Sequence, residues 1–157
     1  MMYKDLSILS LDQSTTKTGW AYFLEDDFVT SGILTTNDGM NGMMDNILKL
    51  VNELKPTYII FEDIYLNQDP KFKKIGVQEF KKLAQLQGYI RGICHIQDLG
   101  YYIIPPTEWK SHYKFKGKRE EQKRASIDYV KTNYKLDASD DETDAILLGQ
   151  YILDIRE

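Results

Sequence analysis

Residues 58–62 read Tyr58-Ile59-Ile60-Phe61-Glu62, in which four apolar side chains come directly before a carboxylate. An uninterrupted apolar run of this length predicts a strand that is buried on both faces, as central parallel strands are. Residues 40–51 carry apolar side chains at helical spacing, and Pro56 ends that pattern. We therefore predict a helix followed by a central strand that ends at Glu62.

The rest of the chain extends this α/β pattern in both directions. Strands are predicted over 6–11, 20–24 and 28–35, which form a three-stranded meander, and over 101–104. Helices are predicted over 78–97, near Trp109, and over 120–133 and 140–153. Strands that are joined by helices run parallel, so their C-terminal ends meet at one edge of the sheet. The order predicts a mixed five-stranded sheet, a meander plus parallel strands, flanked by helices.

Length and composition fit one intracellular domain. The chain has 157 residues, of which 42% are hydrophobic, so we expect a single domain over 1–157 with a proper core. The N-terminus lacks a signal-peptide pattern and no apolar run reaches the ~18 residues of a membrane span, so we expect a cytoplasmic protein with no membrane partner. The lone Cys94 sits in an apolar helical stretch, which predicts a buried structural thiol.

Charge is distributed unevenly along the chain. The net charge is −4, which by itself argues against a nucleic-acid partner. However, residues 71–82 and 110–124 are rich in lysine and arginine, whereas residues 137–157 are acidic. Such a chain could bind a polyanion at its basic surface while its acidic centre holds cations.

Carboxylates end two predicted strands. Asp12 closes the first strand and Glu62 closes the buried one, so on neighbouring parallel strands both would project from the same edge of the sheet. A carboxylate at a strand end is, by itself, more often a turn former or a helix cap. The pair gains weight only if further acids join it.

The start of the last helix supplies those acids. Residues 139–142 form a capping box, in which Ser139 caps the helix and the Glu142 side chain reaches back. Asp141 and Asp144 then lie at the top of an apolar, core-facing stripe, where an unpaired carboxylate is costly and a cation should meet it. The helix dipole also favours acids in the first turn, which accounts for Asp141 but less readily for Asp144.

The four carboxylates suit a hard cation. His95 and His112 stand apart and no combination with Cys94 gives zinc spacing, whereas oxygen ligands alone suit Mg²⁺ or Mn²⁺. Two such ions can activate a water and stabilise the leaving oxygen in phosphodiester hydrolysis.

Three motifs resemble the RuvC-type Holliday junction resolvases of the RNase H-like (retroviral integrase) superfamily, including phage-type members. They are Ile8-Leu9-Ser10-Leu11-Asp12-Gln13-Ser14 with Thr18-Gly19-Trp20-Ala21, then Ile60-Phe61-Glu62-Asp63-Ile64-Tyr65, and Asp141-Glu142-Thr143-Asp144-Ala145-Ile146. The resemblance implies an RNase H-like fold and a metal-dependent, structure-selective endonuclease that resolves Holliday junctions or other branched DNA by paired hydrolysis. It also implies that Asp12, Glu62, Asp141 and Asp144 are the catalytic residues and hold two Mg²⁺ ions per site, with Mn²⁺ as a substitute.

The basic segments on either side of the acidic edge could contact DNA phosphates or form a solvated lysine-rich surface, and the resemblance adds an aromatic at the junction and a homodimer. The predicted DNA-binding residues are Tyr65, Lys71, Lys73, Lys74, Lys110, Lys116, Lys118, Arg119 and Lys123. Tyr65 takes the place of the aromatic that wedges into the junction, and the catalytic-loop lysine stays open among Lys116, Lys118 and Lys123. A homodimer would use a helical face with Phe80, Leu83, Ala84, Gln87 and Ile90, although in a plain helix that stripe is core. The family's glycine after the first aspartate is replaced by Gln13-Ser14-Thr15.

Two other functions compete with this interpretation. The stretch Leu11-Asp12-Gln13-Ser14-Thr15-Thr16 also resembles the first phosphate motif of sugar kinases and actin-like ATPases. Those proteins clamp ATP between two such domains and carry a Gly-rich adenosine motif that this chain lacks, so we expect no nucleotide cofactor. The other alternative is a non-catalytic DNA-junction-binding protein, which the four acids argue against.

Overall fold

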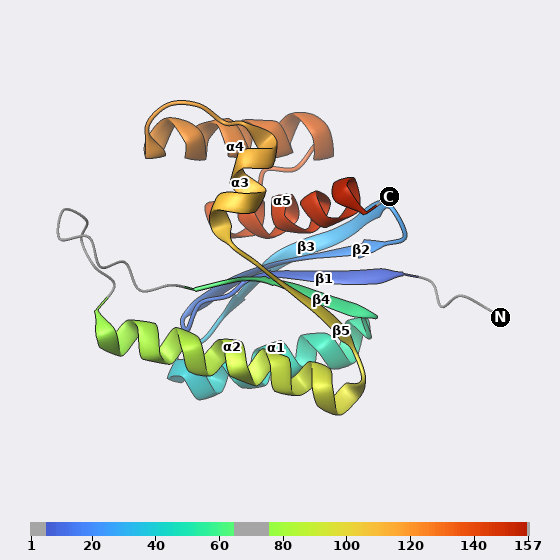
Figure 1. Cartoon of the computed structure of the whole chain (residues 1–157), viewed down its shortest axis with the longest axis vertical. Coiled ribbons are helices and arrows are strands. Elements are labelled where there is room, and N and C mark those ends of the chain that lie inside the picture. The colour runs from blue at the N-terminus through green and yellow to red at the C-terminus, as the bar shows by residue number, and fades with distance from the viewer. Residues whose placement is uncertain (1–5, 65–75, 157) are drawn as a thin grey trace.

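The computed structural model describes residues 6–64 and 76–156 (Figure 1). Its elements are β1 (Ser7–Asp12), β2 (Lys17–Leu24), β3 (Asp27–Thr35), α1 (Gly39–Leu54), β4 (Tyr58–Glu62), α2 (Val77–Gln97), β5 (Gly100–Ile104), α3 (Pro106–Tyr113), α4 (Arg119–Tyr134) and α5 (Asp140–Ile155). The order and type of elements that the sequence predicts are confirmed.

The strands form one five-stranded mixed sheet in the order β3-β2-β1-β4-β5. The meander β1, β2 and β3 is antiparallel, whereas β4 pairs in parallel with both β1 and β5. In the parallel register Leu11 lies beside Phe61, so the next residue on each strand, Asp12 and Glu62, lies at the same edge. The prediction that these two carboxylates end neighbouring strands is confirmed.

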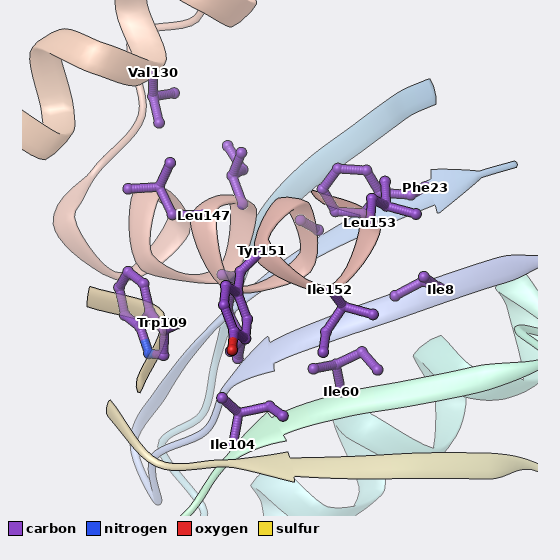
Figure 2. Close-up of a cluster of buried hydrophobic side chains, with 14 of the residues drawn as sticks. Ile8, Phe23, Ile60, Ile104, Trp109, Val130, Leu147, Tyr151, Ile152 and Leu153 are labelled. Carbon is purple, nitrogen blue, oxygen red and sulfur yellow. The ribbon is translucent and has the colours of Figure 1, made fainter. Parts of the chain in front are cut away.

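The two faces of the sheet carry different hydrophobic clusters. On β1 and β4, Leu9, Leu11, Ile59 and Phe61 pack with α1 and α2. The alternate residues, such as Ile8 and Ile60, pack against α5, as Figure 2 shows. Because side chains alternate along a strand, Asp12 and Glu62 share the α5 face with these isoleucines. Strand periodicity therefore decides which helix can reach the two carboxylates.

Helix α5 lies between the sheet and the pair α3 and α4 (Figure 1). It is buried on its sheet side and also on its outer side, where Leu147 and Val130 of α4 belong to one cluster (Figure 2). The Tyr113 hydroxyl of α3 donates a hydrogen bond to the Leu147 carbonyl oxygen at 2.7 Å. Gly149 lets the helix approach closely, because a Cβ there would overlap the ring of Phe23 and lie 3.0 Å from the Cβ of Ser10.

Helix α2 covers the opposite face of the sheet beside α1. Its buried residues are Leu86, Ile90, Ile93 and Cys94, so the predicted buried thiol is confirmed. Assigning Ile90 to an interface is wrong, because it is fully buried against the sheet of its own chain. Over the described residues, each helix is too short or too polar to cross a membrane.

Substituting Gly149 tests how tightly α5 is seated on the sheet. Gly149→Ala should lower the free energy of unfolding by about 1–3 kcal/mol, since the added methyl group overlaps Phe23. Gly92→Ala on α2 is the matched control, because a Cβ there meets nothing within 4 Å and alanine favours a helix by about 0.5–1 kcal/mol. Chemical denaturation measures both changes, and an unchanged or more stable Gly149→Ala would contradict the packing.

Candidate active site

The predicted acids come together where β1, β4 and the start of α5 meet. Gly19 of β2 pairs with Asp12 across the ladder. A Cβ on Gly19 would overlap the carbonyl oxygen of Asp141, so only a glycine lets the first turn of α5 lie directly against β2. This approach brings Asp141 and Asp144 close enough to Asp12 for their charges to act on it.

Contacts of Ser139 and Glu142 fix the start of α5. The Ser139 hydroxyl accepts a hydrogen bond from the Glu142 amide at 3.4 Å, and the Ser139 carbonyl accepts from the Thr143 amide at 2.8 Å. The predicted N-cap is thus confirmed, but the return contact of the capping box is wrong. The Glu142 carboxylate instead accepts a short hydrogen bond from the hydroxyl of Ser31, because β3 passes beside the helix start. Helix α5 is therefore tied to the meander at its first turn.

The acids carry more negative charge than their surroundings compensate. Burial raises the pKa of Asp12 well above its ordinary value, and the charges of Glu62, Asp144 and Asp141 raise it further. Burial, followed by the charge of Asp140, raises the pKa of Asp144 from 3.8 to about 7. Carboxyl groups in this condition either hold protons or bind a cation.

Glu62 is affected by both signs of charge. Burial raises its pKa, whereas the ammonium group of Lys110 and a hydrogen bond with Asp12 lower it. The indole N–H of Trp109 also lies near enough to lower the pKa of Glu62. That nitrogen is buried and is directed toward Glu62, but within residues 6–64 and 76–156 it does not reach full hydrogen-bonding geometry with any acceptor.

The residues fit a hard divalent cation by their chemistry. Within the part of the chain that the structure describes, no three His, Cys, Asp or Glu side chains already stand in positions to hold one ion. The donors are nevertheless carboxylates alone, they are half-buried, and the charges of neighbouring carboxylates raise the pKa values of Asp12 and Asp144, which is the environment that Mg²⁺ or Mn²⁺ relieves. Binding an ion would require the side chains to turn toward it.

A cavity of about 280 Å³ opens beside these acids. One wall holds Asp12, Asp140, Asp141 and Asp144. The facing wall comes from α3, α4 and their connection, and its residues are Trp109, Lys110, Phe115, Arg119, Gln122, Lys123 and Ser126. An anionic ligand could lie along the basic wall while cations occupy the acidic one.

The predicted basic residues differ in whether they line the cavity beside the acids. Lys110, Arg119 and Lys123 line the cavity, whereas Lys116 and Lys118 do not. The Nζ atom of Lys123 lies 3.1 Å from a carboxylate oxygen of Asp140. Tyr65, Lys71, Lys73 and Lys74 lie outside the described residues.

Sequence reasoning missed three features of this site. Lys110 is predicted only as a DNA-binding residue, whereas in the structure it follows the buried Trp109 and its charge acts on both Glu62 and Asp144. The Gln13 side chain hydrogen-bonds the backbone of Glu62. The sequence predicts Trp109 only as part of a short helix, with no role at the site. A buried tryptophan directly before a lysine was the one available signal, since a glutamine after a strand reads as a turn.

Replacing Asp144 tests the uncompensated charge. Its folded-state pKa of about 7 exceeds its ordinary value of 3.8, so the folded state binds the proton more tightly. Stability should therefore fall as the pH rises from about 4 through 7 when EDTA removes divalent ions. At pH 8 Asp144→Asn should raise the free energy of unfolding by roughly 2–4 kcal/mol, measured by denaturation.

The matched control is Asp45→Asn, at an exposed position of α1. It should leave the pH profile unchanged. If Asp144→Asn keeps the wild-type pH profile of stability and gains nothing at pH 8, then Asp144 is not the carboxyl group with the raised pKa.

Comparison with known proteins places the chain in a family and a fold. The family model described as "Lactococcus phage M3 protein" matches residues 4–155. A search of curated proteins found no match. Among solved structures, Thermus thermophilus RuvC in complex with a Holliday junction substrate has a TM-score of 0.69 and 11% identity, covering 93% of this chain and 92% of that one.

One viral and one eukaryotic resolvase are also similar in structure to this chain. The fowlpox virus resolvase, solved with substrate Holliday junction DNA, has a TM-score of 0.65 and 15% identity, covering 95% of this chain and 97% of that one. The yeast mitochondrial Holliday junction resolvase Ydc2 has a TM-score of 0.59 and 14% identity, covering 98% of this chain and 80% of that one. Identity this low bears on fold alone, and the predicted RNase H-like fold of RuvC-type resolvases is confirmed. The chain belongs to the family of the Lactococcus phage M3 protein.

Proposed function

We propose that this protein is a metal-dependent endonuclease that resolves Holliday junctions or other branched DNA by paired phosphodiester hydrolysis. The observation that carries the proposal is the half-buried cluster of Asp12, Glu62, Asp141 and Asp144, in which the pKa values of Asp12, Glu62 and Asp144 are raised, beside a cavity with a basic wall. Acids beside a basic wall match the needs of phosphoryl chemistry, in which cations neutralise the phosphate and basic side chains place it.

The solved neighbours give the substrate class. RuvC of Thermus thermophilus and the fowlpox virus resolvase were both solved with Holliday junction DNA, and both share the fold over nearly their whole length. Transferring that substrate to this chain rests on the shared fold and on the acids at the sheet edge of this chain. We further propose that residues 1–157 act as one nuclease domain.

The four carboxylates would hold two Mg²⁺ ions, with Mn²⁺ as a substitute. When bound, such ions lower the pKa of a water and stabilise the departing oxygen. The Trp109 indole N–H can donate to an acceptor that enters beside Glu62.

The basic wall would hold the DNA strand. We propose that Lys110 places its ammonium group against the phosphate that is cut, since its charge already acts on Glu62 and Asp144. Arg119 and Lys123 would contact neighbouring phosphates, and Lys123 would exchange Asp140 for DNA. Lys116, Lys118 and the lysines of 71–74 would extend this contact, and Tyr65 would stack at the junction.

A cleavage assay tests the proposal. A labelled synthetic four-way junction and a linear duplex with the same arms are incubated with Mg²⁺ or EDTA. We expect paired nicks in the junction only when Mg²⁺ is present. Asp12→Asn should reduce cutting to background while junction binding, measured by gel shift, stays close to wild type, because one metal ligand is lost and the basic wall remains.

Asp45→Asn controls for the loss of one negative charge, and it should cut normally. In the same assay Lys110→Met should slow cutting more than it weakens binding. Binding without any metal-dependent cutting would instead identify a non-catalytic junction-binding protein. Substantial cutting by Asp12→Asn would remove Asp12 from the active site.

We also propose a homodimer, because two paired nicks in a nearly two-fold symmetric junction need two active sites. The exposed side of α2 around Ala84 is the candidate interface, now without the buried Ile90. Size-exclusion chromatography with light scattering at micromolar concentration should give about twice the mass of one 18.3 kDa chain. The mass of a single chain would count against the dimer.

A further inference from the structure

Gln13 occupies the gap where the β1–β4 ladder stops. The parallel pairing runs from Ile8 beside Tyr58 to Leu11 beside Phe61, and it does not continue to Asp12 and Glu62. Gln13 is the first residue after β1, yet its side chain is only 8% exposed. A polar side chain buried at a strand end must satisfy its hydrogen-bonding groups there.

The Gln13 amide satisfies both groups on the backbone of Glu62. Its Nε2 atom donates to the Glu62 carbonyl oxygen at 2.6 Å, and its Oε1 atom accepts from the Glu62 amide at 3.2 Å. One donor and one acceptor on a planar amide reproduce the groups of a peptide unit. The side chain therefore extends the ladder by one rung at the residue that carries the carboxylate.

The strand on the other side of Glu62 completes this hold. Glu62 pairs with Ile104 of β5, and the amide of Asp63 donates to the Ile104 carbonyl oxygen at 2.9 Å. The backbone of Glu62 is thus fixed from β5 on one side and from Gln13 on the other. A strand end held from both sides resists fraying.

Gln13 is itself anchored from the next strand. The buried hydroxyl of Thr18 on β2 accepts from the Ser14 amide at 3.1 Å and donates to the Ser14 carbonyl oxygen at 3.0 Å. The turn after β1 therefore has a fixed backbone, and the Gln13 side chain is aimed at β4 from a rigid support.

We infer that Gln13 is a positioning residue that keeps the Glu62 carboxylate beside Asp12, ready to bind a divalent cation. Like charges at two adjacent strand ends push the strands apart, and the two hydrogen bonds oppose this separation. Gln13 acts through the backbone of Glu62 and not on the ion. The inference rests on the proposed metal site, and it deepens that proposal by naming a residue where the resolvase resemblance has glycine.

Gln13→Met removes both hydrogen bonds while nearly keeping the size of the side chain. Amide hydrogen exchange by NMR should show faster exchange at Glu62, because its acceptor is gone. Mn²⁺ affinity, measured by calorimetry on the full chain without DNA, should weaken by about 10-fold to 100-fold. In the junction assay kcat should fall at subsaturating Mg²⁺, with little change in KM for the junction.

Gln97→Met is the matched control. Gln97 donates to the side-chain oxygen of Asn52 at 3.1 Å at the opposite end of the sheet, so its loss should leave all three measurements at wild-type values. If Gln13→Met does not fold, Gln13→Asn keeps the amide and withdraws it by one methylene, and it should give the same changes.

Two outcomes overturn the inference. They are wild-type exchange at Glu62 in a folded variant, and unchanged Mn²⁺ affinity despite faster exchange. The exchange and Mn²⁺ measurements need no DNA cleavage. If Gln13→Met changes both amide exchange and Mn²⁺ affinity but the wild-type protein never cuts DNA, the positioning role is retained and the nuclease proposal is lost.

Discussion

The close contact between α5 and the sheet is the constraint on which the rest of this structure depends. Gly149 and Gly19 each sit where a methyl group would overlap the opposing element, Phe23 in one case and the backbone of Asp141 in the other. Removing side chains at two contact points lets helix and sheet approach along the whole length of α5. The same approach brings carboxylates from a helix and from strand ends into one cluster, so packing and site share one cause.

This cluster is held against its own electrostatics. Burial raises the pKa values of Asp12, Glu62 and Asp144, and the charges of neighbouring carboxylates raise those of Asp12 and Asp144 further. Lys110 offsets only part of this for Glu62 and Asp144. A fold selected for stability alone has no reason to gather such groups, whereas a cation-binding site does. Backbone supports such as the Gln13 amide then become necessary, because side chains that repel one another do not hold their own positions.

The charge distribution explains how an acidic protein could bind the DNA substrate that we propose. The net charge of −4 is an average over the whole chain, whereas the cavity has an acidic wall from β1 and α5 and a basic wall from α3 and α4. A DNA strand meets the local field and not the average, since charges beyond about 10 Å are screened at ordinary salt. The fold itself tolerates wide sequence change, as identities of 11–15% at TM-scores of 0.59–0.69 illustrate.

The sequence by itself determined the helices and strands, the parallel direction of the strands that helices connect, and the elements on which the four acids lie. Periodicity, prolines and the Ser139 cap are local signals, so they can be read without the fold. It also predicted that Asp12 and Glu62 share an edge, since parallel strands have only one C-terminal edge. Only the tertiary structure decided that Glu142 bonds Ser31, that the charge of Lys110 acts on Glu62, and that Gln13 supports Glu62. These contacts join residues 48 to 111 positions apart, and no local pattern encodes which distant partner a polar side chain meets.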